Sequence, residues 1–443
     1  MIRRRTGTVP FAILILAILI SSTGAARQQP PPQKVDKFKV EQGLLMLESV
    51  HEEVKKHYYD PTFHGVNIDA EFAKAKDKIG TVDSLSRTFA IIADTLDSLH
   101  DSHTFFQPPA RGYSVEYGFR RKMIGDKCFV TNVRPGTDAE KKGLKPGDQI
   151  LTINGYPLDR ETLFKLDYMY ETLSPQPGLI LNVESPDGSR QRFQVQADIE
   201  HFNSLDSAND IFYRADKAQE NERPRFHEFG DDLIFIQVSN FVMSTIDFDT
   251  VISKMRKHKA VVLDMRGNPG GAVSEVEDLI RNVMDRDVHI GDRITRGGRR
   301  PENVRGFGHN AYTGKITVIL DSRSGSAAEV TSRVLQLEKR ATVIGELSEG
   351  KVMEARTYVD FIGAGRVFGY ATSVTEADLI MADGKSLENI GVTPDEVVLP
   401  TAADLAAGRD PVLARAAAIS GIAITPEEAF KMFPYIWLRN YFR

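Results

Sequence analysis

Beyond residue 230 the chain alternates short apolar runs with segments of helical periodicity, and this alternation restricts the possible folds more than any other feature. The runs are rich in Val, Ile and Leu, as strands buried inside a sheet are. Strands that alternate with helices form α/β domains. The sequence therefore predicts an α/β core, with a helix beginning near Ser326 and strands at residues 233–238, 260–264, 316–321 and 341–345.

Length and composition set wider limits. A chain of 443 residues exceeds one ordinary core, so we expect two or three domains. Hydrophobic residues make up 41% and charged residues 26%, as in soluble globular proteins. The net charge of −5 leaves no basic surface of the kind that binds nucleic acid. There is no His-Glu-x-x-His run and no cysteine cluster, so we expect no metal and no other cofactor. Nothing in the sequence indicates an oligomeric state.

The N-terminal residues have the order of an export signal. Three arginines at 3–5 precede an apolar run at 9–20 and then small residues. We expect a signal peptide over residues 1–26, cleaved after Ala25 or Ala26, and an exported protein, periplasmic or extracellular. A retained anchor is the alternative, but the apolar run is shorter than the roughly 20 residues that span a bilayer, so no permanent membrane span is expected.

A helical segment follows the export signal. Residues 27–36 contain three consecutive prolines and are expected to form a stiff linker. Apolar residues then recur at three- and four-residue steps up to Asp60-Pro61, and a second helical pattern covers residues 84–99. We interpret residues 37–111 as a helical N-terminal subdomain.

Residues 112–200 are dense in short β-like runs separated by turn signals. Tyr117-Gly118-Phe119 and the later segment 143–155 closely resemble the PDZ domains of bacterial proteases. Backbone N–H groups of Tyr117, Gly118 and Phe119 can bind the terminal carboxylate of a peptide, and an exposed strand edge can pair with that peptide. We therefore expect a mostly β PDZ domain at 112–200 that binds polypeptides with free C-termini, and an irregular connector at 201–230.

Two segments of the core carry candidate catalytic residues. One strand runs into Arg-Gly-Asn-Pro-Gly-Gly at 266–271, where small residues let backbone amides approach a bound carbonyl. No Lys-Ser/Thr pair follows, which argues against a nucleotide-binding loop. A second strand leads into Ser-Gly-Ser-Ala-Ala-Glu at 324–329. Ser326 lies near the first turn of the expected helix, whose N–H groups and dipole stabilise an oxyanion. Local sequence also allows Ser324 or Ser326 to be a simple N-cap.

The PDZ-like segment and these two motifs, in this order, resemble the carboxyl-terminal processing, or tail-specific, serine proteases over roughly residues 40–400. The resemblance implies a crotonase-like α/β protease core at 231–400, followed by a C-terminal helical tail at 401–443. It also implies that Ser326 is the nucleophile and that oxyanion donors come from Gly270 or Gly271 and from the Ala327 amide. The last serine of the family motif is Ala328 here.

The resemblance further implies a lysine as general base. Lys351 of a Gly-Lys pair, 25 positions after Ser326, matches the family's lysine. A lysine acts as a base when burial lowers its pKa, and Ser-Lys pairs are a known form of nucleophile activation. The family usually has a glutamine four residues beyond this lysine, where Ala355 stands here. Glu354 beside it would keep the ammonium charged and weaken the base.

A second candidate base lies before the PDZ-like segment. Ser102 and His103 resemble the Ser-His segment of the tricorn-type branch of the same superfamily, where histidine is the base. In that branch a distant glutamate completes the set, and Glu388 lies near the expected place. Lysine-type relatives carry a similar Asp-x-His stretch with a structural role. The sequence therefore favours a Ser-Lys pair and leaves His103 open.

Together these features predict an exported serine endopeptidase that binds polypeptide C-termini through its PDZ domain. A non-catalytic peptide- or ligand-binding protein on the same scaffold is the alternative, and the presence of Ser326 with two candidate bases argues against it. A PDZ scaffold that only recruits partners would leave residues 231–400 unexplained.

Overall fold

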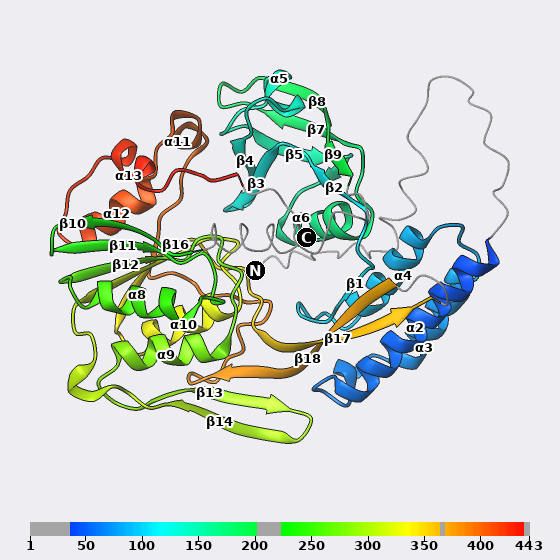
Figure 1. The fold of residues 1–443 in the computed structure, drawn as a ribbon. Coiled ribbons are helices and arrows are strands. Elements are labelled where there is room, and N and C mark those ends of the chain that lie inside the picture. Colours follow the sequence, from blue (N-terminus) through cyan, green and yellow to red (C-terminus); the bar gives the residue numbers. More distant parts are fainter. Residues whose placement is uncertain (1–35, 202–222, 364–367, 438–443) are drawn as a thin grey trace, which may run out of the picture. The chain divides into compact units, whose positions relative to one another are not determined.

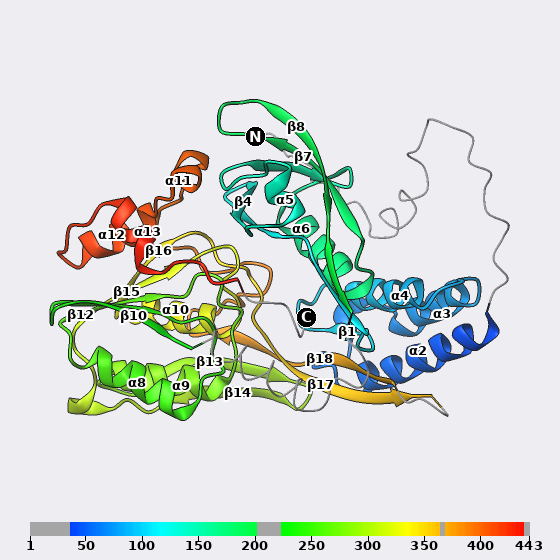
Figure 2. The same ribbon diagram turned by 45° about the horizontal axis from the view of Figure 1, so that its top comes forward.

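The structure is a computed structural model that describes residues 36–201, 223–363 and 368–437 (Figures 1 and 2). The expected signal peptide, nearly all of the expected linker and most of the expected connector lie outside these residues. The chain divides into two compact units. The first unit comprises Met1–Ala110 with Arg356–Val374, and the second comprises Arg111–Ala355 with Thr375–Arg443.

The first unit is built mainly from helices whose apolar faces pack together. In α2 the buried residues recur at helical spacing, as in Met46, Val50 and Val54, and α2 contacts both α3 and α4. The sequence indicated α2 and α4, whereas α3 was not predicted. The short strand β1 pairs antiparallel with the part of β18 (Phe368–Met381) that belongs to this unit. The elements are α2 (Lys37–His57), η1 (Phe63–Gly65), α3 (Ile68–Ile79), α4 (Leu85–Asp97) and β1 (Phe105–Gln107).

The second unit begins with a β-rich region. Its main sheet has the order β3-β4-β5-β7-β8, with β6 beside β5, so β3 lies at one edge. Strand β7 alternates buried and half-buried residues, as a sheet with one face on a core requires. The elements are β2 (Tyr113–Glu116), β3 (Phe119–Ile124), β4 (Lys127–Val133), α5 (Asp138–Lys141), β5 (Gln149–Ile153), β6 (Tyr156–Pro157), α6 (Arg160–Asp167), η2 (Tyr168–Leu173), β7 (Gly178–Glu184), β8 (Arg190–Gln196) and β9 (Asp198–His201).

The core of the second unit is a six-stranded sheet in the order β10-β11-β12-β15-β16-β19. All neighbouring pairs are parallel except β10 with β11. The four strands expected from the sequence are present as β11, β12, β15 and β16, which confirms the α/β fold class. The strands are β10 (Arg225–Phe229), β11 (Leu233–Gln237), β12 (Ala260–Asp264), β15 (Lys315–Leu320), β16 (Ala341–Gly345) and β19 (Glu396–Val397).

Helices cover both faces of this sheet (Figures 1 and 2). Val261 and Leu263 of β12 pack on one face with α8, α9 and α10, while Ala260 and Val262 pack on the other with α12 and α13. Each fully buried side chain of this size contributes roughly 1.5–3 kcal/mol to stability, which explains the nearly continuous apolar strands. The helices are α8 (Thr245–Met255), α9 (Val273–Val283), η3 (Gly308–Asn310), α10 (Ala327–Leu337), α11 (Ala402–Ala407), α12 (Pro411–Ile419) and α13 (Pro426–Met432).

A hairpin of β13 (Val288–Thr295) and β14 (Gly298–Val304) extends the second unit by pairing with the end of β18 (Phe368–Met381). The strand β17 (Met353–Ile362) also pairs with β18. No helix in the described residues is both long enough and apolar enough to cross a bilayer.

Parallel pairing places three loops at one edge of the core sheet. Residues 265–271 follow β12, residues 321–326 follow β15 and residues 346–352 follow β16. The ladder continues into them, because Met265 N donates to Ile319 O and Glu346 N donates to Leu320 O, both at 3.0 Å. Ligands of α/β sheets bind beyond the carboxyl ends of the strands. A binding or active site is therefore expected at this edge.

Candidate active site

Ser326 lies at the turn that joins β15 to α10 and is partly buried. Its backbone has φ 51° and ψ −118°, a conformation that costs a residue other than glycine about 1–3 kcal/mol. Strain of this kind occurs at nucleophilic serines on sharp strand-to-helix turns, where it exposes the hydroxyl.

Ser324 and Gly325 tie this turn to the glycine-containing loop after β12. The Ser324 hydroxyl, fully buried, accepts a hydrogen bond from Asp321 N at 2.9 Å and donates to Met265 O at 2.8 Å. Gly325 N donates to Asn268 O at 2.8 Å. Ser324 therefore supports the turn.

Gly270 lies directly against Ser326. A Cβ atom on Gly270 would approach Ser326 Cβ to 2.4 Å and Ala327 N to 2.9 Å, so a side chain is excluded here. Gly270 N donates to the Asn268 side chain at 2.8 Å. In contrast, the amides of Gly271 and Ala327 donate to no acceptor in the described part of the chain. Of the oxyanion donors expected from the sequence, Gly271 N and Ala327 N are thus the candidates whose N–H groups are not already bound.

The buried carboxylate of Asp321 connects both loops to the β-rich region. It accepts Gly267 N at 2.9 Å and Arg323 N at 3.0 Å, and it pairs with Lys122 Nζ of β3 at 2.8 Å. Burial disfavours its ionisation, but Lys122 and the backbone donors outweigh burial and lower the pKa of Asp321 to about 2. Asp321 is therefore ionised at neutral pH.

Lys351 follows β16 at the same edge. Its Nζ lies 2.6 Å from Glu349 Oε1 and 3.1 Å from the ring centroid of Phe164 in α6. Burial lowers the pKa of Lys351, and Glu349 opposes part of that shift. The carboxylate partner expected from the sequence was Glu354, and that expectation is wrong: Glu354 pairs with Arg293.

Main-chain bonds hold Ser326 next to the Lys351 segment. Ser326 N donates to Lys351 O at 2.8 Å, and Val352 N donates to Glu388 Oε2 at 2.9 Å. The structure thus brings Ser326, Lys351, Glu388 and the oxyanion glycines together within the second unit.

Ser102 and His103 belong to the first unit. The Ser102 hydroxyl and His103 Nδ1 lie 2.7 Å apart, and His103 N donates to Asp101 Oδ1 at 2.8 Å. Ser102 and His103 therefore contact each other through their side chains, and the turn at Asp101 fixes the His103 backbone.

The candidate carboxylate-binding loop precedes β3. Gly118 has φ 75° and would clash with Thr137 if it carried a Cβ atom. Its N–H donates to Glu116 Oε1 at 3.2 Å, and Glu116 pairs with Arg120. Tyr117 and Phe119 are buried beside it. The loop amide is thus already bound to an internal carboxylate.

Sequence reasoning missed the acidic residues that organise this site: Asp321, Glu329 and Glu349. Glu329 alone carried a usable signal, because Ser326-x-x-Glu329 is the pattern of a helix capping box. Lys122 and Gly267, two of the partners of Asp321, come from segments that no local pattern connects to it.

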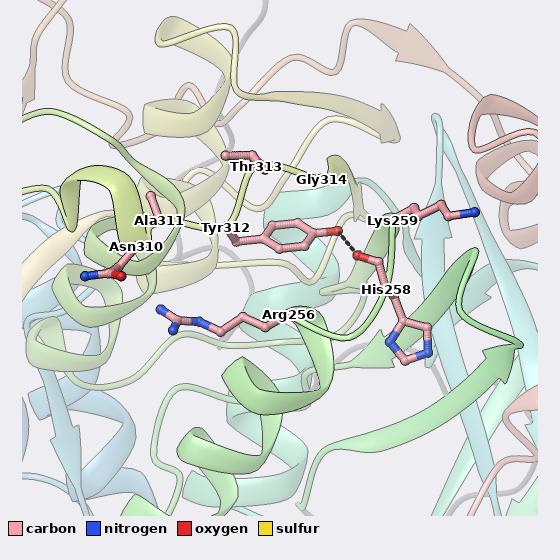
Figure 3. A pocket seen from close by; sticks show the side chains of 8 residues that line it. All are labelled: Arg256, His258, Lys259, Asn310, Ala311, Tyr312, Thr313 and Gly314. Carbon is pink, nitrogen blue, oxygen red and sulfur yellow. Dashed lines mark hydrogen bonds between the residues drawn. The ribbon is translucent and has the colours of Figure 1, made fainter.

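A pocket of about 410 Å³ lies at the opposite edge of the core sheet, before β12 and β15 (Figure 3). Its basic side chains have partners, and the Tyr312 hydroxyl donates to the His258 carbonyl. It is separate from the candidate active site. The pocket is lined by Arg256, His258, Lys259 and residues 310–314.

Within residues 36–201, 223–363 and 368–437, no group of three or more His, Cys, Asp or Glu could hold a metal ion.

The fold and the site are those of an α/β serine-type peptidase with a PDZ domain. Residues 232–398 match peptidase family S41, and residues 112–163 match the PDZ domain. The chain therefore carries a region that matches the S41 peptidases and is similar to carboxyl-terminal processing proteases over most of its length. This confirms the resemblance and the fold class expected from the sequence.

The similarity to other proteins extends over most of the chain. It is 22% identical over 410 residues to carboxyl-terminal-processing peptidase 2, chloroplastic, of Arabidopsis thaliana, covering 88% of this chain and 75% of that protein. It is 26% identical over 414 residues to a carboxyl-terminal-processing protease of Synechocystis, covering 89% and 88%. The crystal structure of mature CPAF shares the fold, with a TM-score of 0.63 and 15% identity over 83% of this chain and 94% of that one.

The contact between Gly270 and Ser326 leads to a steric prediction. Gly270→Ala should displace Ser326 and lower peptide hydrolysis by about 10²-fold, the cost of a misplacement near 1 Å. Gly267→Ala is the matched comparison, because Gly267 also has positive φ but a Cβ atom added to it would meet no atom within 4 Å. It should lose far less activity. Hydrolysis rates and melting temperatures of both variants test this, and equal losses would contradict the steric argument.

Proposed function

We propose that this peptidase is an exported endopeptidase that cleaves by acyl-enzyme chemistry with Ser326 as nucleophile. The observation that carries the proposal is the strained Ser326 turn, which lies against Gly270 and is followed directly by the Ala327 amide. The amides of Ala327 and of Gly271, the residue after Gly270, donate to no acceptor in the described residues. This arrangement supports acyl transfer, which needs a nucleophile and donors for the developing oxyanion.

The proposed reaction has two stages. Ser326 Oγ attacks the scissile carbonyl carbon while its proton passes to the general base, and Gly271 N and Ala327 N bind the oxyanion. The C–N bond then breaks, and the base returns the proton to the departing amine. Water, deprotonated by the same base, hydrolyses the ester and restores Ser326.

Lys351 is the base favoured by this proposal. Its burial lowers its pKa toward the range in which an amine accepts a proton near neutral pH. In the present arrangement the ammonium binds Glu349 and the Phe164 ring, so it must exchange Glu349 for Ser326 before it can act. In the alternative, His103 is the base, with Ser102 orienting its ring and Glu388 completing the set.

Substrate recognition is assigned to the PDZ domain. The Gly118 amide already binds a carboxylate, that of Glu116, which supports the same amide as the site for the carboxylate of a substrate C-terminus. Such a tail would displace Glu116 and pair with the start of β3. Export through residues 1–26 completes the proposal.

Removing the nucleophile is the first test. Ser326→Ala should lower peptide hydrolysis by at least about 10³-fold, because the covalent path is lost while no large cavity forms. Ser324→Ala should cost less. A serine-directed phosphonate should label wild-type Ser326, as located by mass spectrometry. Wild-type activity in Ser326→Ala would disprove the assignment.

A substitution of Glu349 distinguishes Lys351 from His103 as the general base. If Lys351 is the base, Glu349→Gln removes a charge that raises the Lys351 pKa, so the acidic limb of kcat/KM should move to lower pH by on the order of one unit. Lys351→Ala should be inactive and His103→Ala active. An unmoved limb, with His103→Ala inactive and Lys351→Ala active, would assign the base to His103. The pH at which the wild-type acidic limb falls does not by itself identify the base. Burial raises the pKa of Glu329 to about 7, which is close to the pKa of a histidine.

Recognition of a free C-terminus is tested with the inactive full-length protein. Ser326→Ala should bind a peptide acid more tightly than the same peptide amide, by about 1–3 kcal/mol or roughly 5- to 150-fold in Kd, because the amide loses charge-assisted hydrogen bonds. Calorimetry measures both affinities. Equal affinities would show that the domain recognises something other than a chain end.

A further inference from the structure

The carboxylate of Glu329, like that of Asp321, is a heavily hydrogen-bonded buried acid of the candidate active site. Glu329 lies in the first turn of α10 and is fully buried. It has no role in the mechanism proposed above. Burial of a carboxylate is unfavourable unless its oxygens are fully hydrogen-bonded. The hydrogen-bond partners of Glu329 therefore indicate its role.

The two oxygens of Glu329 accept four hydrogen bonds. Oε2 accepts Ser326 N at 3.0 Å and Lys351 N at 2.9 Å. Oε1 accepts the Ser348 hydroxyl at 2.5 Å and Gly350 N at 2.8 Å. One oxygen is therefore shared between the amide of the nucleophile and the amide of the candidate base.

An ordinary helix cap does not account for this arrangement. In a capping box the acidic side chain at the third helical position binds only the N-cap amide. Here three further donors come from Ser348, Gly350 and Lys351, in the loop after β16. Burial raises the pKa of Glu329 and these donors and Ser326 lower it, and burial outweighs them to give a pKa of about 7. Since every partner donates, the ionised form is the one that the site accommodates.

We propose that Glu329 is a positioning residue whose ionised carboxylate fixes the Ser326 turn against residues 348–351, so that nucleophile and Lys351 keep one relative placement. This inference rests on the proposed role of Ser326. Glu329 touches neither substrate nor the PDZ loop, and so it acts on the chemical step through the two segments it joins.

The test compares Glu329→Gln with Thr331→Val. Glutamine keeps the shape of the Glu329 side chain. Its NH₂ group, a donor, would replace one carboxylate oxygen and face two of the four groups that donate to Glu329. Thr331 lies on the same helix, is fully buried, and its hydroxyl has no partner in the described residues, so Thr331→Val controls for disturbance of α10. Peptide hydrolysis gives kcat and KM, and a serine-directed phosphonate gives the rate and the final extent of Ser326 labelling.

Glu329→Gln should lower kcat and the labelling rate by about 10²-fold, with KM and the final extent of labelling unchanged. Thr331→Val should stay within about twofold of wild type, because it removes an unpaired hydroxyl. A structural role alone would instead reduce the fraction of protein that labels and leave its rate unchanged. That result, or wild-type labelling rates in Glu329→Gln, would overturn the proposal.

A second variant keeps the test decisive if Glu329→Gln does not fold. Ser348→Ala removes one of the four donors and leaves the carboxylate in place, so it should lower kcat roughly 3- to 10-fold at unchanged KM. Wild-type kcat in Ser348→Ala would then count against the proposal. Failure of the proposed function is seen separately, since the wild-type protein would then not be labelled at Ser326.

Discussion

The strands β12, β15 and β16 run parallel in adjacent positions of the core sheet, so their carboxyl ends meet and the loops after them are forced together. Each loop brings one part of the candidate site: the oxyanion glycines, Ser326 and Lys351. Because the strands are buried on both faces, their register is fixed by packing, and a slip of one residue would reverse every side chain. The rigidity of the sheet is thus what holds the reacting groups in place.

Buried carboxylates do the fine positioning that the sheet cannot. Asp321 binds amides of the glycine loop and of the Ser326 turn, and Glu329 binds the Ser326 turn and the Lys351 loop. Both sit where irregular backbone leaves N–H groups without ladder partners, and burying such donors unpaired is costly. The two carboxylates therefore accept hydrogen bonds from backbone N–H groups of these loops and fix the loops to each other.

The core strands could be predicted from the sequence because their burial leaves continuous apolar runs; β12 and β16 have the bounds that were expected. The β13–β14 hairpin gave no such signal, since most of β14 is exposed and charged. At the site, Ser326 and the glycines stood in recognisable motifs. The partners of Asp321 did not, because a buried carboxylate that binds distant groups leaves no periodicity in the chain. Glu354 was named instead of Glu349 because both lie within three residues of Lys351, and sequence separation does not show that the turn after β16 directs Glu349 to the ammonium.

The contacts of Lys351 link its protonation to the PDZ domain. Glu349 and the Phe164 ring both stabilise the ammonium, and a cation–π contact contributes about 0.5–2 kcal/mol. Phe164 lies on α6, while Ser322 and Arg323, just before the nucleophile, donate to carbonyls of the edge strand β3. A peptide paired along the whole of β3 would have to replace those two hydrogen bonds. A shift of β3 and α6 on strand addition would therefore act on both sides of the site at once, on the turn that carries Ser326 and on the contact between Phe164 and the Lys351 ammonium.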